Sequence, residues 1–132
     1  MSAEDIVNEF MERIVRKDLD AACELVSDDI EYDNVPMGKV YGPDGIKGFL
    51  GPMVDGLDEV DWVIHRQTAS DTLVLNERTD RFGMNGKWMD LPVAGVFEVH
   101  DGRITLWRDY FDMTTFTNQL TELAGSPGGD TE

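Results

Sequence analysis

Apolar residues recur every three or four positions in the first part of the chain, which is the spacing of one helix face. A first helix is predicted to begin at Ser2, because Ser2 followed by Asp5 forms a helix-capping pattern. A second short helix is predicted over residues 19–26, and a third is predicted to open at Gly42-Pro43-Asp44. The apolar stripe of the first helix is Ile6, Val7, Phe10, Met11, Ile14 and Val15, and that of the third is Ile46, Phe49, Leu50 and Met53.

Strand patterns dominate the second half of the chain. Strands are predicted over residues 30–35, 60–68, 72–82, 88–99 and 103–113. The dipeptides Asn85-Gly86 and Asp101-Gly102 separate the last three strands and favour tight hairpin turns, so these strands should form an antiparallel meander. A closing helix is predicted over residues 114–123, with Asp112 as its cap.

The order α-α-β-α-β-β-β-β-α predicts an α+β fold. The sheet should be curved, mixed but mainly antiparallel, and packed on the N-terminal helices as a cone with a pocket at its open end. One domain is predicted over residues 1–124, with no internal repeat. The last residues, 125–132, are rich in glycine and should form a flexible tail.

Composition narrows the possible partners. The chain has 132 residues and a net charge of −16, which argues against nucleic acid or an anionic membrane as a partner. No apolar run approaches the length of a membrane span, and the N-terminus lacks the basic and apolar regions of a signal peptide. A soluble cytoplasmic protein is therefore expected.

Neither cysteine nor histidine chemistry is expected. The single cysteine, Cys23, lies among apolar residues at helical spacing and is interpreted as a buried core thiol. His65 and His100 are far apart in the sequence and have no ligand-like spacing around them. The sequence therefore predicts no metal site.

Three charged residues fall on strand faces that should point inward. Alternation along a strand gives Arg78 and Asp80 one face in common with Asn76, and it places Asp109 between two aromatic residues. A guanidinium at Arg78 can donate to both carboxylates, and burial beside it should leave the two acids sharing one proton. An acid and a base held together suit an active site, although a structural buried salt bridge uses the same residues.

Tyr32 and Asn34 share a face of the first predicted strand. Their hydroxyl and amide groups can hold a water molecule, and an ionised Asp109 nearby could take its proton. Asn34 can equally serve as a turn residue. Trp62 fits either a pocket wall or the core, and the core is the favoured interpretation.

The combined motifs resemble one enzyme family. The segments Tyr32-Asp33-Asn34-Val35-Pro36-Met37, Asn76-Glu77-Arg78-Thr79-Asp80, Leu91-Pro92-Val93-Ala94-Gly95-Val96-Phe97 and Trp107-Arg108-Asp109-Tyr110-Phe111-Asp112 are similar, in this order and spacing, to those of the limonene-1,2-epoxide hydrolase family. The resemblance runs from about residue 6 to residue 116. It implies a cone-shaped fold like that of nuclear transport factor 2 (NTF2), a homodimer, and one-step addition of water to a small apolar epoxide without a cofactor.

The resemblance also implies residue roles. Asp80 would protonate the epoxide oxygen, Asp109 would take a proton from water held by Tyr32 and Asn34, and Arg78 would bridge the acids. The apolar pocket would be lined by Leu91, Val93, Trp107, Phe111 and Phe116. Two other functions remain open: an isomerase or cyclase on the same cone fold, like ketosteroid isomerase, and a non-catalytic small-molecule binding domain.

Overall fold

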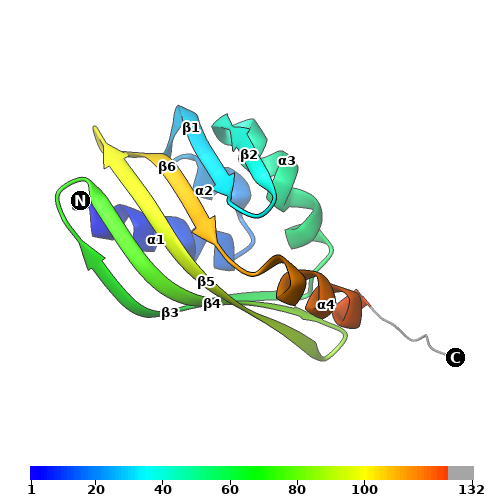
Figure 1. Ribbon diagram of the computed structural model, residues 1–132. Helices are drawn as coiled ribbons and strands as arrows, with labels where there is room; N and C mark the ends of the chain where they lie inside the picture. Colours follow the sequence, from blue (N-terminus) through cyan, green and yellow to red (C-terminus); the bar gives the residue numbers. More distant parts are fainter. Residues whose placement is uncertain (125–132) are drawn as a thin grey trace, which may run out of the picture.

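The computed structural model describes residues 1–124, which form one six-stranded sheet and four helices (Figure 1). The helices are α1 (Ala3–Val15), α2 (Leu19–Cys23), α3 (Gly42–Asp55) and α4 (Met113–Ala124). The strands are β1 (Val26–Asn34), β2 (Gly38–Tyr41), β3 (Glu59–Ala69), β4 (Leu73–Met84), β5 (Lys87–His100) and β6 (Arg103–Tyr110). The tail predicted at residues 125–132 lies outside the described residues.

The helix ends follow the expected chemistry. Asp5 donates its backbone N–H to Ser2 Oγ at 3.1 Å, and the Asp5 carboxylate accepts from the Ser2 backbone at 3.1 Å, so the predicted capping pattern of α1 is confirmed. The predicted cap of α4 is confirmed as well, because Asp112 accepts from the Thr115 backbone at 2.8 Å. Between residues 1 and 124, no helix has both the length and the apolar character needed to span a bilayer.

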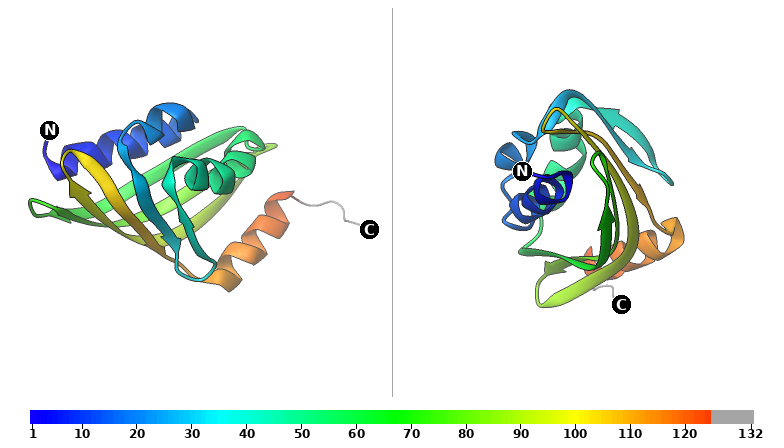
Figure 2. Two further views of the ribbon diagram at one scale, coloured as in Figure 1. Left: turned by 90° about the horizontal axis from the view of Figure 1, so that it is seen from above. Right: turned by 90° about the vertical axis from the view of Figure 1, so that its left-hand side faces the viewer.

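The sheet has the strand order β2-β1-β6-β5-β4-β3 and is mixed. Neighbouring strands pair antiparallel except β1 and β6, which run parallel. Both predicted hairpin turns are present, with positive φ angles of 55° and 76° at Asn85 and Gly86 and of 53° and 76° at Asp101 and Gly102. The sheet curves around the N-terminal helices (Figure 2). The predicted α+β fold with a curved, mainly antiparallel sheet is therefore confirmed.

The structure adds one strand and shortens one helix relative to the sequence prediction. Strand β2 was not predicted; it pairs with β1 from Gly38 to Tyr41, and its exposed side chains show no alternating pattern. Helix α2 ends at Cys23, although the pattern extended it to residue 26. Val26 instead pairs with Ile104 of β6, so tertiary pairing overrides the local helical spacing.

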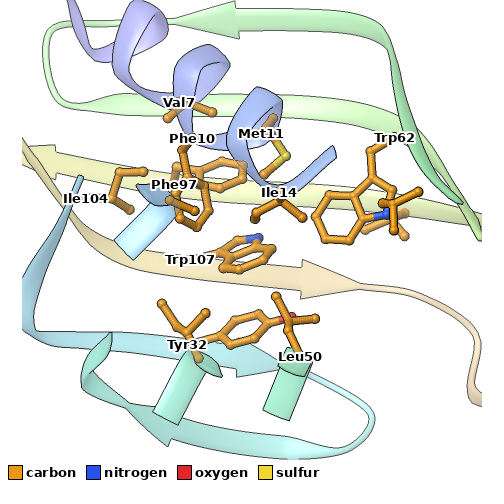
Figure 3. Close-up of a cluster of buried hydrophobic side chains, with 14 of the residues drawn as sticks. Val7, Phe10, Met11, Ile14, Tyr32, Leu50, Trp62, Phe97, Ile104 and Trp107 are labelled. Atoms are coloured by element: carbon orange, nitrogen blue, oxygen red, sulfur yellow. The ribbon is translucent and has the colours of Figure 1, made fainter. Parts of the chain in front are cut away.

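A row of aromatic side chains crosses the sheet beneath α1. Tyr32 of β1 and Phe97 of β5 lie beside Trp107 of β6 in register, and both rings stack on the indole, with centroid distances of 3.9 Å and 6.0 Å (Figure 3). Phe10 of α1 meets the same indole edge-on at 5.1 Å. The polar residues of the candidate site lie next to this row, and its packing holds them in place from the core side.

Candidate active site

A polar row crosses the inner face of the sheet next to the aromatic row. The strand registers pair Asn34 with Asp109, Asp109 with Gly95, Gly95 with Asn76, and Asn76 with Gln67. Gln67 joins this row because the register of β3 shifts between residues 64 and 66, and a bulge of this kind reverses which residues face inward. Five strands therefore contribute to one line of residues at the site.

Arg78 joins the two acids that the sequence singled out. Its Nε and Nη2 donate to the Asp80 carboxylate at 2.9 Å and 3.0 Å. Nη2 also donates to Asp109 Oδ2 at 2.9 Å, and Nη1 donates to Asn76 Oδ1 at 2.9 Å. One guanidinium thus fixes both carboxylates in a defined relative position, as the sequence predicted for Arg78.

The cluster is buried, and burial decides its protonation. Arg78, Asp80 and Asp109 are only 1%, 4% and 3% exposed. Burial raises the pKa of Asp80, and it outweighs the opposing effect of Arg78. Burial also disfavours the charged guanidinium, but Asp109 and Asp80 together raise the pKa of Arg78, so it stays a cation. The raised pKa favours the protonated form of Asp80, and that form can act as an acid.

Trp107 does not line the pocket, which corrects the sequence prediction. It is fully buried, and its Nε1 donates to Asp109 Oδ1 at 3.0 Å. Strand alternation predicted the correct face of β6 for Trp107. The residue nevertheless belongs to the aromatic row of the core and does not reach the cavity. It therefore holds the carboxylate of Asp109 from below. Burial and the nearby Asp109 raise the pKa of Tyr32 well above its usual range, so Tyr32 keeps its hydroxyl proton.

A chain of side-chain amides connects Arg78 to helix α1. Asn76 Nδ2 donates to Gln67 Oε1 at 3.0 Å, and Gln67 Nε2 donates to Glu4 Oε2 at 3.0 Å and to Asn8 Oδ1 at 2.9 Å. Arginine can only donate and an ionised glutamate can only accept, so the two charged ends fix the orientation of both amides. Sequence reasoning placed Asn76 on the inner face but gave it no role, and it missed Gln67.

Gly95 gives the cluster its space, and sequence reasoning missed it as well. A Cβ at this position would lie 2.7 Å from Asn76 Oδ1 and 3.0 Å from Asp109 Oδ1, and it would collide with Arg78 Nη1. An isolated glycine inside a strand is the sequence signal for such a close approach.

An apolar pocket opens above the acids. Of the predicted residues, Leu91, Val93, Phe111 and Phe116 line it, together with Tyr32, Asn34, Asp80 and Asp109. Its remaining walls include Met37, Phe49, Met53, Trp62 and Phe82. The cavity volume is about 30 Å³, which is small beside the several hundred Å³ of a typical ligand pocket. A larger molecule can enter only when wall side chains move, and methionine is the most adaptable residue among them.

The structure offers no assembled metal site among residues 1–124, where no three histidine, cysteine or acidic side chains converge. His65 instead lies 2.8 Å from Thr79 Oγ1 on the outside of the molecule. The absence of a metal or cofactor in the reaction stays a prediction.

Comparisons with known proteins point to one enzyme family. The family model of the limonene-1,2-epoxide hydrolase (LEH) catalytic domain matches residues 1–122. The epoxide hydrolase EphG of Mycobacterium tuberculosis is 38% identical over 107 residues, which are 81% of this chain and 71% of EphG. The structure of an LEH-like epoxide hydrolase from M. tuberculosis matches with a TM-score of 0.76 and 35% identity, covering 91% of this chain and 90% of that one.

The fold also occurs well outside this family. An NTF2-like protein from Burkholderia pseudomallei matches with a TM-score of 0.77 over 89% of this chain and 96% of that one, at 20% identity, a likeness of fold alone. The structure is therefore an NTF2-like cone. Within that fold class, the chain belongs to the limonene-1,2-epoxide hydrolase family, and the family resemblance read from the sequence is confirmed.

Proposed function

We propose that the protein is a cofactor-independent epoxide hydrolase that adds water to a small, largely apolar epoxide in one step and releases a vicinal diol. The observation that carries this proposal is the contact of Arg78 with both Asp80 and Asp109 beneath an apolar pocket. Isomerases and cyclases on this fold need one base and an oxyanion donor, and a binding domain needs neither. Two acids held by one guanidinium suit a reaction in which one proton is delivered while another is removed.

In the proposed reaction, protonated Asp80 gives its proton to the epoxide oxygen as the carbon–oxygen bond of the ring breaks. A water oxygen forms the new bond to that carbon, and ionised Asp109 takes the proton that the water loses. Tyr32 and Asn34 line the pocket beside Asp109 and would orient this water. The cycle closes when Asp109 releases its proton to solvent and Asp80 regains one.

The origin of the added oxygen tests the one-step route. In a single turnover with excess enzyme in ¹⁸O-water, the diol should carry the heavy label, because no ester to the protein forms. Unlabelled diol together with labelled aspartate in the protein would instead show that a carboxylate is the nucleophile.

Asparagine substitutions test the two acids separately. Asp80→Asn and Asp109→Asn should each lower turnover by at least about a hundredfold, the usual contribution of a general acid or base. Asp29→Asn is the matched control, because Asp29 is exposed and does not line the pocket. A folded variant that keeps a tenth of wild-type turnover would contradict the assigned role.

We further propose that the protein is a homodimer and that it acts in the cytoplasm. The outer face of the sheet supports the first proposal: it exposes Leu75 and Tyr110 beside a hollow whose wall also includes Ala94 and Val96. A cytoplasmic location rests on the single, buried free cysteine, Cys23, which fits a reducing compartment.

A further inference from the structure

Trp62 of β3 carries a buried hydrogen-bond donor that nothing in residues 1–124 satisfies. Its side chain is 7% exposed, and its indole Nε1 has no acceptor among the described residues. Nearly all buried polar groups in proteins have partners, so an unpaired donor at a functional site points to a ligand or to ordered water. This donor lies at the candidate active site, since Trp62 lines the pocket and pairs in register with Asp80.

The indole of Trp62 is held in one orientation by its neighbours. Phe82 meets it edge-on at a centroid distance of 5.9 Å, and Trp107 packs against it at 6.1 Å. The guanidinium carbon of Arg78 lies over the ring, 5.5 Å from its centroid. In Figure 3 the nitrogen of Trp62 lies on the part of the ring turned away from Trp107. A ring packed in this way cannot rotate freely to find another acceptor inside the protein.

The proposed hydrolysis does not use the indole N–H of Trp62. Asp80, Asp109, Tyr32 and Asn34 account for the proton transfers and for the water, and most of the remaining wall is apolar. Core packing alone does not explain a tryptophan here, because phenylalanine would supply an aromatic ring without an unpaired N–H. The N–H of Trp62 is therefore a buried donor without an acceptor in the described part of the chain, on a residue that lines the pocket.

We propose that the indole N–H of Trp62 binds an acceptor oxygen on the substrate. The preferred substrates would then be epoxides whose apolar frame carries one ether, carbonyl or hydroxyl oxygen near the epoxide ring, in place of pure hydrocarbons. This inference rests on the proposed function and narrows its substrate class. Trp62 acts as a specificity-determining residue, since a donor that stays unpaired with a hydrocarbon disfavours that substrate.

Matched substrates isolate this hydrogen bond. Phenyl glycidyl ether and 1,2-epoxy-4-phenylbutane have nearly the same shape and differ by an ether oxygen in place of a methylene group. Benzyl glycidyl ether and its all-carbon analogue move the oxygen relative to the aromatic ring. The measured quantity is the ratio of kcat/KM for each ether to that for its hydrocarbon partner, with wild-type enzyme, Trp62→Phe and the control Trp88→Phe. Trp88 is partly exposed on the outside of the sheet and does not line the pocket.

We expect the wild-type enzyme and Trp88→Phe to favour at least one ether by about five- to tenfold, the range of a single neutral hydrogen bond. Trp62→Phe should lower that ratio by about the same five- to tenfold, whatever happens to its overall rate. Because intrinsic reactivity is the same for both enzymes, it cancels when their ratios are compared. Equal ratios in wild type and Trp62→Phe for every pair would overturn the proposal and leave Trp62 as a packing residue.

An NMR titration of the wild-type protein gives a second measurement that needs neither turnover nor a folded variant. The chain has three tryptophans, so three indole N–H signals are expected in a ¹H–¹⁵N spectrum. The diol from the favoured ether should move the Trp62 signal downfield, and the diol from the hydrocarbon should move it less. Equal shifts with both diols would contradict the proposal. If wild-type enzyme hydrolyses none of the epoxides, the proposed function fails, while titration with the unreacted ether still tests the donor.

Discussion

At the scale of single residues, Arg78 sets the geometry of the site. Its hydrogen bonds reach Asp80, Asp109 and Asn76 in different directions within one plane, which only a guanidinium can do. Asp80 and Asp109 are like charges in a buried site, and the shared cation lets them lie close together. The chemical difference between the two acids then follows from their surroundings, since Trp107 donates to Asp109 and burial raises the pKa of Asp80.

Replacement of Arg78 by lysine should be severe. An ammonium group can neutralise charge, but it cannot make the paired contacts to Asp80 and the contact to Asp109 together. We expect Arg78→Lys to lower kcat/KM for epoxide hydrolysis by about a hundredfold or more, with the fold checked by circular dichroism. Arg81→Lys on the same strand, half-buried at the surface, is the matched control. Near wild-type activity in Arg78→Lys would reduce Arg78 to a simple counter-charge.

The raised pKa of Asp80 predicts that the site lowers stability as pH rises. Above the ordinary value of 3.8, the unfolded chain has released the Asp80 proton while the folded chain still holds it. The contribution of Asp80 to the stability of the wild type therefore falls with rising pH up to the pKa of Asp80 in the folded protein. Asparagine does not titrate, so Asp80→Asn lacks this dependence.

Urea unfolding from about pH 4 to about pH 7 should detect this effect. The free energy of unfolding of the wild type should decrease across the range relative to that of Asp80→Asn, and Asp29→Asn, which keeps Asp80, should show the same decrease. A constant difference between wild type and Asp80→Asn would mean that the folded protein leaves the pKa of Asp80 at its ordinary value.

At the scale of elements, strand alternation was the most informative sequence signal. It correctly assigned Asn76, Arg78 and Asp80 to one inner face, because the period of a strand depends only on local backbone geometry. The family resemblance implied that Trp107 lines the pocket wall, and alternation could not correct this because it does not give the depth of a residue within the cone. Trp107 lies beneath the wall. Gln67 was missed because a bulge reverses the alternation of β3, and a bulge leaves little mark in the sequence.

Local sequence patterns also could not predict which elements, distant in the sequence, pair with each other. Strand β2 exists because the edge of β1 offers free backbone groups, and its own side chains carry no strand pattern. The parallel pairing of β1 with β6 joins residues about 75 positions apart, for example Tyr32 with Trp107. The sequence nevertheless placed both acids, the arginine and four residues of the apolar wall, since each lies in a segment whose type could be predicted locally.

Gly95 tests how closely the strands must approach at the site. A methyl group there would press on Asn76, Asp109 and Arg78, and displacements of about 1 Å at a catalytic group can cost two orders of magnitude in rate. Gly95→Ala should therefore lower kcat/KM by at least about tenfold in a protein that still folds. Gly48→Ala is the control, because a Cβ at Gly48 meets nothing within 4 Å. Unchanged activity in Gly95→Ala would mean that Arg78 has room to shift without consequence.

At the scale of the whole molecule, the two faces of the sheet have different tasks. The N-terminal helices lie against the inner face (Figure 2). The acids and the pocket lie on that face as well, while alternation sends Leu73, Leu75 and Val96 to the outer face. Leu75 is 40% exposed and Tyr110 is 47% exposed, an apolar patch on a chain whose net charge is −16. Burial of this patch favours association, and the charge opposes it.

The homodimer proposal therefore predicts a salt-dependent equilibrium. Two strongly acidic chains repel each other, and added salt screens that repulsion, so dimerisation should strengthen as sodium chloride is raised from about 20 mM to about 300 mM. Sedimentation should give about twice the chain mass of 14.8 kDa for the wild type at the higher salt. Leu75→Asp adds a charge at the centre of the patch and should return the mass to that of one chain at every salt concentration. Leu120→Asp places the same change on the exposed side of α4 and should leave the dimer intact. A wild-type protein that sediments as one chain at every salt concentration would contradict the homodimer, and the outer apolar patch would then not bind a second copy of the chain.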